Sequence, residues 1–134
     1  MTAQTSGRVD LVSSIVIGAF GAFTFVFGVW ALVDAASFYD NIAKFGQYNR
    51  HFLHDVGAFQ MGLGACLLFA LVWRDDALLA VLGGAAVGAT AHEIAHIWDH
   101  QLGGRDADPF TIGIMAAILV ATFLWRLRWR YRAG

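Results

Sequence analysis

Charged residues, proline and cysteine are all scarce in this chain of 134 residues. Only 14% of the residues are charged and 58% are hydrophobic, and there is a single proline, a composition typical of an integral membrane protein rather than a soluble domain. The net charge is −1, and we therefore expect no nucleic-acid partner. Cys66 is the only cysteine, so the chain can form no internal disulfide and contains no CxxC metal-binding motif.

Four long apolar segments predict four membrane-spanning helices. Their approximate bounds are 11–33, 52–73, 77–98 and 110–125. A spanning helix needs about 20 apolar residues, and a helix satisfies its own backbone hydrogen bonds in lipid. We therefore expect an all-α fold with one domain, residues 1–134, in which four transmembrane helices form an antiparallel up-down bundle within a lipid bilayer. The first segment is longer than the apolar region of a signal peptide, so we expect it to be retained.

The connections between these segments differ in character. Residues 34–50 mix polar side chains with aromatic ones, which suits a segment at the membrane interface; the aromatic residues are Phe38, Tyr39, Phe45 and Tyr48. Residues 99–109 form a short polar loop that contains Gly103 and Gly104. Small residues within the segments, such as the GxxxG pair Gly84 and Gly88, favour close helix packing inside the bundle.

The basic residues predict the orientation of the chain. The end that holds both termini carries Arg8, Arg74, Arg126, Arg128, Arg130 and Arg132, whereas the other end carries Lys44, Arg50 and Arg105. Because basic residues favour the cytoplasmic side, we expect both termini in the cytoplasm, with the protein in the cytoplasmic membrane.

All five histidines fall at the extracytoplasmic ends of apolar segments. His51 and His54 occur in the run RHFLHD, and three more occur in the run AHEIAHIWDH: His92, His96 and His100. The same runs carry the carboxylates Asp55, Glu93 and Asp99. Ionisable side chains are costly to bury near lipid and indicate a functional site. Histidine with carboxylate is a common ligand set for zinc, copper and non-haem iron.

Helical geometry predicts which of these side chains can meet. Residues four apart lie on the same face, so His96 can share one ion with His92 or with His100. Asp99 falls on the same arc, while His51, His54 and Asp55 share an arc of the second segment. Antiparallel packing would bring His54 or Asp55 opposite the histidine pair. We expect a transition metal, copper or zinc before iron, on a set drawn from His51, His54, Asp55, His92, His96, Asp99 and His100. Asp34 could be a further partner.

The stretch from His92 to His96 matches HExxH and resembles the zinc-binding motif of zincin metalloproteases. That resemblance implies His92 and His96 as ligands and Glu93 as a catalytic general base. It covers five residues, and it leaves open that Glu93 is instead a ligand or the partner of one. Two histidines on facing helices could alternatively hold a b-type haem, with His54 opposite His92 or His96.

The pattern YNRHFLHDVGAFQMGLG, followed by a helix that ends HEIAHIWDH, resembles a group of small four-span bacterial membrane proteins, loosely similar to DoxX-like proteins. The resemblance implies a topology but no activity. Three functions therefore remain open. The protein could handle a metal or act as an accessory subunit of a membrane complex, or as a homo-oligomer. It could be a metal-dependent membrane hydrolase or oxidase. It could be a structural or assembly subunit whose histidines form only a polar network.

Overall fold

The structure is a computed structural model that describes residues 3–44, 46–103 and 105–132. Phe45 and Gly104 lie outside the described residues. Every regular element in the described part of the chain is helical. The elements are α1 (Ala3–Val33), α2 (Ala35–Asn41), α3 (Arg50–Val72), α4 (Ala77–Asp99), the 3-10 turn η1 (His100–Leu102) and α5 (Asp108–Arg132).

The all-α prediction is confirmed, and four of the helices are long and apolar enough to cross a membrane. Their ends differ from the predicted bounds mainly near the two termini, where α1 begins at Ala3 instead of residue 11 and α5 continues to Arg132 instead of ending near residue 125. The apolar run of the fourth segment stops near residue 125, but arginine is a good helix former and α5 continues through the arginines that follow.

The predicted interfacial segment contains one short helix, α2. Its first turn is capped by the Asp34 carboxylate, which lies 3.1 Å from the Ser37 nitrogen.

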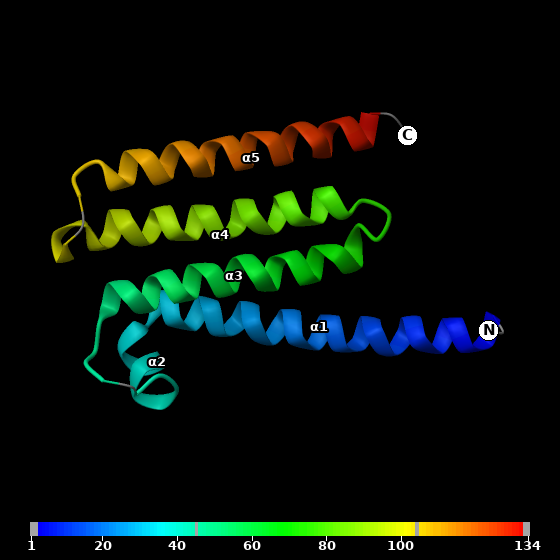
Figure 1. Cartoon of the computed structure of the whole chain (residues 1–134), viewed down its shortest axis with the longest axis horizontal. Coiled ribbons are helices and arrows are strands. Elements are labelled where there is room, and N and C mark those ends of the chain that lie inside the picture. Colours follow the sequence, from blue (N-terminus) through cyan, green and yellow to red (C-terminus); the bar gives the residue numbers. More distant parts are fainter. Residues whose placement is uncertain (1–2, 45, 104, 133–134) are drawn as a thin grey trace.

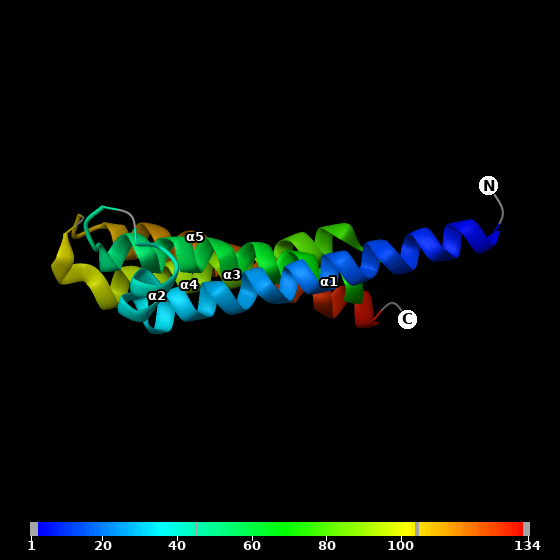
Figure 2. The ribbon, with the colours of Figure 1, turned by 90° about the horizontal axis from the view of Figure 1, so that it is seen from below.

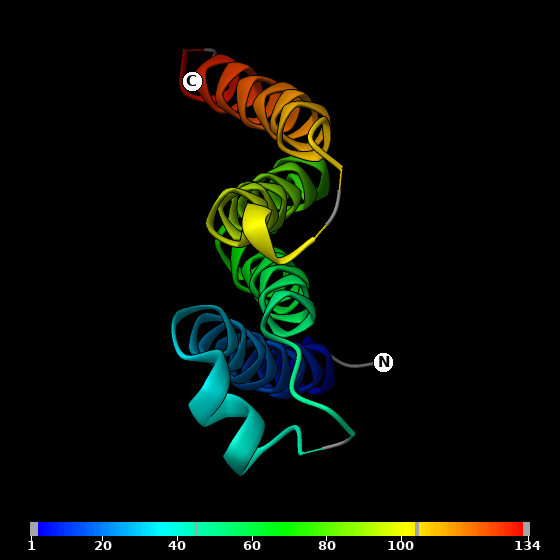
Figure 3. The same ribbon diagram turned by 90° about the vertical axis from the view of Figure 1, so that its left-hand side faces the viewer.

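The long helices lie side by side in a single curved row rather than around a central axis (Figures 1 and 3). The order across the row is α1, α3, α4 and α5, and each helix packs on the next. In the described part of the chain, α1 and α5 make no extensive contact with each other. Neighbouring long helices run in alternate directions, so both termini lie at one end, where α1 extends beyond the others (Figures 1 and 2).

Glycines set the spacing of α3 against both of its neighbours. A Cβ atom on Gly57 would lie 2.8 Å from the carbonyl oxygen of Gly28 in α1. On the other side, a Cβ on Gly62 would lie 3.0 Å from the Cα of Gly88 in α4. Only glycine permits backbones to approach so closely, which is how membrane helices gain packing energy.

Ion pairs connect α5 to the α3–α4 turn at the end of the molecule that holds the termini. Asp76 caps α4 by accepting a hydrogen bond from the Leu79 nitrogen at 3.0 Å. The same carboxylate accepts hydrogen bonds from Arg126 of α5, at 3.1 Å to Nε and 2.7 Å to Nη2. Arg130 reaches Asp75 at 2.9 Å. These contacts fix α5 to the α3–α4 turn and leave the histidines at the opposite end of the molecule.

Candidate metal centre

The start of α3 and the end of α4 lie next to each other at one end of the row. Asn49 caps α3, with its side-chain oxygen 3.0 Å from the Phe52 nitrogen, so the helix already includes the run from Arg50 to Asp55. Because α3 and α4 are packed neighbours of opposite direction, this run faces the stretch from His92 to Asp99. Two histidine-rich runs that are far apart in the sequence are thereby joined.

Three side chains form a group that could hold a metal ion: His51, Asp55 and His96. One ligand atom from each lies within 4.8 Å of the other two. Nε2 of His51 is 3.6 Å from Oδ2 of Asp55, and Nε2 of His96 is 3.9 Å from Oδ1 of Asp55. Two donors that each sit about 2.1 Å from one ion are at most roughly 4.2 Å apart. Both distances to Asp55 fall below this limit.

His92 lies beside this group and offers a further donor to Asp55 and His96. Its Nε2 atom lies 3.3 Å from Oδ1 of Asp55 and 3.1 Å from Nε2 of His96. The i, i+4 spacing on α4 places the two imidazoles on one face. The Asp55 carboxylate therefore has three imidazole nitrogens within 4 Å, one from α3 and two from α4.

The Asp55 carboxylate is the clearest sign that this group suits a cation. Its Oδ1 atom is buried and has no hydrogen-bond partner among the described residues. A buried acceptor without a partner is costly, and more so when it carries charge. The nearest groups to this oxygen are nitrogens that can bind a metal only in their neutral form. A divalent cation would neutralise the carboxylate and bind those nitrogens at the same time.

Asp99 is completely buried and holds the histidines of α3 in place. Arg50 donates to Oδ1 at 2.9 Å through Nε and lies 2.8 Å away through Nη2. Nδ1 of His54 donates to Oδ2 at 2.6 Å, and Nδ1 of His51 lies 3.3 Å from the same oxygen. A carboxylate that accepts from Nδ1 directs Nε2 toward the ion, a common arrangement behind metal-bound histidine. Asp99 thus supports the group without being part of it.

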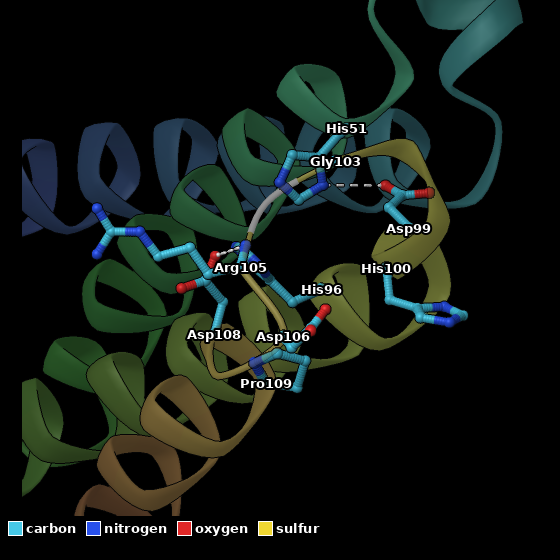
Figure 4. Close-up of a pocket in the computed structure, with 9 residues that line it drawn as sticks. All are labelled: His51, His96, Asp99, His100, Gly103, Arg105, Asp106, Asp108 and Pro109. Atoms are coloured by element: carbon cyan, nitrogen blue, oxygen red, sulfur yellow. Dashed lines mark hydrogen bonds and ion pairs between the residues drawn. The ribbon is translucent and has the colours of Figure 1, made fainter.

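The remaining predicted site residues lie outside the group. His54 is buried against Asp99 and Trp98 and is not one of the grouped ligands. His100 is exposed in η1, and Figure 4 shows its ring directed away from His51 and His96. Glu93 lies against α5, where a Cβ on Gly113 would be 3.1 Å from its Oε1 atom. The Oε2 atom of Glu93 is buried and has no partner in the described part of the chain.

A small polar cavity leads from the loop side to the group. It has a volume of about 200 Å³ and is lined by His51, His96 and residues of the α4–α5 connection (Figure 4). His100, Arg105 and Asp106 stand on its exposed side. Two of the three grouped ligands can therefore be reached from water.

Comparisons with family models, curated proteins and solved structures return no match. The likeness to small bacterial four-span proteins stays a prediction. The function must accordingly be argued from the site alone.

Sequence reasoning did not identify the role of Arg50. Its position beside His51 was visible, and a basic residue within a histidine and carboxylate run signals a buried ion pair. Arg50 neutralises Asp99, which would otherwise be an unpaired buried charge.

Proposed function

We propose that this protein is an integral membrane protein that binds a transition-metal ion between α3 and α4. It acts as a metal-handling protein or as an accessory subunit of a larger membrane complex. The observation that carries the proposal is the buried Oδ1 atom of Asp55, which has no hydrogen-bond partner among the described residues. The imidazoles of His92 and His96 lie beside this oxygen, and that of His51 lies beside the other oxygen of the carboxylate. These side chains would be the ligands, and Asp99 would orient His51.

The donor set favours a borderline transition metal. Imidazole suits zinc, copper and iron, whereas calcium and magnesium prefer sites made only of oxygen. Copper and zinc remain our first choices. Two histidines with one carboxylate also match the ligand set of non-haem iron sites. A b-type haem held by His54 and by His92 or His96 fits less well, because His54 is buried against Asp99 and Trp98 whereas His92 and His96 lie beside Asp55.

Metal content separates this proposal from a purely structural role. The protein is purified in mild detergent, supplemented with zinc, copper or iron, freed of excess metal and analysed for bound ion. We expect close to one ion per chain, and His96→Ala should lose most of it. His100→Ala is the matched control, because His100 lies on the same run but is exposed outside the group. Loss of metal in both variants alike, or in neither, would contradict the ligand assignment.

An enzymatic role remains the second candidate because of Glu93. A carboxylate buried in a membrane protein without a partner indicates function. If the site were hydrolytic or oxidative, Glu93→Gln would keep the metal and abolish turnover. If Glu93 were a ligand or bonded to one, the same substitution would weaken metal binding. Because Glu93 packs against Gly113 of α5, we expect the variant to retain its metal.

A further inference from the structure

A second cavity reaches the same metal centre from the hydrocarbon side. It lies between α3, α4 and α5 and has a volume of about 380 Å³, within the range of small-molecule sites. Its walls include Phe59 of α3 and Ile112 and Met115 of α5. Its floor is the small-residue face of α4, which includes Ala85 and Ala89. We call it the lateral pocket.

His92 makes the lateral pocket different from an ordinary lipid-filled groove. Apart from the thiol of Cys66, every other residue that lines the pocket is apolar. The ring of His92 lies 5.6 Å from that of Phe59, and its Nε2 atom is 3.3 Å from Asp55. One end of an apolar cavity is therefore closed by a residue of the proposed metal site.

The opposite face of the same helices provides an internal comparison. A cavity of about 400 Å³ lies there over α4, and Val87 and Thr90 are among its lining residues. None of its lining residues is a histidine or carries a charge. A lipid acyl chain has no polar group, so it could occupy either of these two cavities equally well. Only the lateral pocket offers an imidazole to a bound molecule.

The metal centre thus lies between two routes of opposite polarity. His51 and His96 line the polar cavity that opens to water. His92 lines the lateral pocket, and its Nε2 atom is only 3.1 Å from that of His96. An ion from the aqueous side and a molecule from the membrane could meet at this centre.

We propose that the lateral pocket binds an uncharged, membrane-soluble molecule with a hydrocarbon body and one oxygen-bearing head that hydrogen-bonds His92 or binds the ion beside it. This inference rests on the proposed metal centre for its chemical role. The head is uncharged because the pocket is lined by apolar residues, and an anion would lose its hydration on entering it. Alcohols, phenols and quinols have this chemistry.

Photolabelling in lipid nanodiscs tests the assignment with the full, metal-supplemented chain. The probe is decanol with a diazirine in its chain, and the control is decane with the same diazirine. Cross-links are mapped by mass spectrometry to Ala85 and Ala89 on one face of α4 and to Val87 and Thr90 on the other. Decanol should label the first face about five-fold more than the second, the effect expected of one hydrogen bond. Decane should label the two faces equally.

Two matched variants complete the test. Ala89→Leu fills the lateral pocket and should abolish the preference of the decanol probe, whereas Thr90→Leu narrows the opposite cavity and should leave it intact. His92→Phe, which keeps a ring without the nitrogen, should make decanol behave as decane does. Equal labelling of both faces by decanol in the unmodified chain would overturn the inference.

Metal content is measured on the same samples, so the two proposals fail separately. Metal binding with equal labelling of the two faces would overturn the pocket assignment and leave the proposed function standing. A decanol preference in protein that binds no metal would overturn the proposed function, while the assignment of ligand chemistry to the pocket would stand.

Discussion

At the scale of single residues, the site depends on carboxylates with different tasks. Asp55 lies beside three imidazoles, and its Oδ1 atom has no hydrogen-bond partner in the part of the chain that the structure describes. Asp99 has every oxygen bonded to Arg50 or to the histidines of α3. The first is suited to bind a cation, and the second is suited to fix the direction of an imidazole. Residue type alone does not distinguish them.

We predict that Asp99→Asn weakens metal binding without abolishing it. The amide oxygen can accept from only some of the three side chains that Asp99 now satisfies, so His51 loses its fixed orientation. The dissociation constant should rise about 10- to 100-fold, the usual effect of removing a partner of a metal-bound histidine. Competition with a chromogenic chelator measures it. Asp106→Asn is the control, because Asp106 lines the polar cavity but is exposed. An unchanged constant in Asp99→Asn would show that His51 does not depend on Asp99.

A second residue-scale prediction concerns pH and Asp76. Hydrogen bonds from Arg126 hold the pKa of the Asp76 carboxyl below its ordinary value. A carboxylate with a lowered pKa stabilises the fold above its unfolded pKa of about 4, and this stabilisation is lost as the pH falls through the folded pKa. Asp76→Asn should therefore lower the thermal stability at pH 7, and the gap to the unmodified protein should close below about pH 4.

Asp75→Asn is the control for that measurement. The Asp75 side chain is 74% exposed, against 10% for Asp76, so solvent screens its pairing with Arg130 and the loss should be smaller. Thermal unfolding in detergent from pH 7 to pH 3 follows both variants. A gap between Asp76→Asn and the unmodified protein that stays constant across this range would rule out the titration of Asp76 as its source.

Residue patterns predicted the meeting of the two histidine runs but not the selection within them. The spacing of His92 and His96 fixes their common face on any helix. Whether His51 or His54 turns toward that face depends on the rotation of α3 about its own axis, which glycine contacts with α1 and α4 determine. These contacts are between residues that are far apart in the sequence. The rotation of α3 therefore cannot be predicted from the local spacing of its residues.

At the scale of helices, the membrane spans could be predicted because the length and hydropathy of each span belong to one continuous segment of the sequence. The arrangement of the helices in a row could not be predicted, because four apolar segments of alternating direction can pack either as a closed bundle or as an open layer. The glycines decide which faces can approach. Gly84 and Gly88 lie against Cys66 and Gly62 of α3, inside the molecule. The GxxxG pair is thus occupied by an internal neighbour.

We predict that Gly57→Ala destabilises the packing of α1 on α3. The added Cβ would lie 2.8 Å from the carbonyl oxygen of Gly28, and a backbone atom cannot rotate away. We expect a loss of about 1–3 kcal/mol, typical of overpacking. Gly18→Ala is the matched control: its Cβ would meet only the Leu71 side chain, at 3.3 Å, and alanine is the better helix former. Unfolding in mixed detergents measures both variants, and equal losses would mean that the close approach of the backbones is not what matters.

At the scale of the whole molecule, charge and chemistry are divided between the two ends. Arg74, Arg126 and Arg130 lie at the end that holds both termini, together with Asp75 and Asp76. The histidine group lies at the other end, beside the polar cavity. The polar cavity is at the histidine end, so the proposed ion would reach the group from the aqueous compartment at that end.

The basic residues lead us to predict which compartment that is. Arginines concentrate at the end with the termini, so this end should face the cytoplasm and the histidine group should face outward. Cys66→Ala removes the only cysteine, and Asp106→Cys or Gly134→Cys then adds a single one for a membrane-impermeant maleimide. In intact cells, we expect labelling at position 106 and none at position 134 until the membrane is opened. The reverse labelling pattern would show that the protein has the opposite orientation in the membrane. It would then place metal uptake on the cytoplasmic side, since the group and its polar cavity stay at the same end of the fold in either orientation.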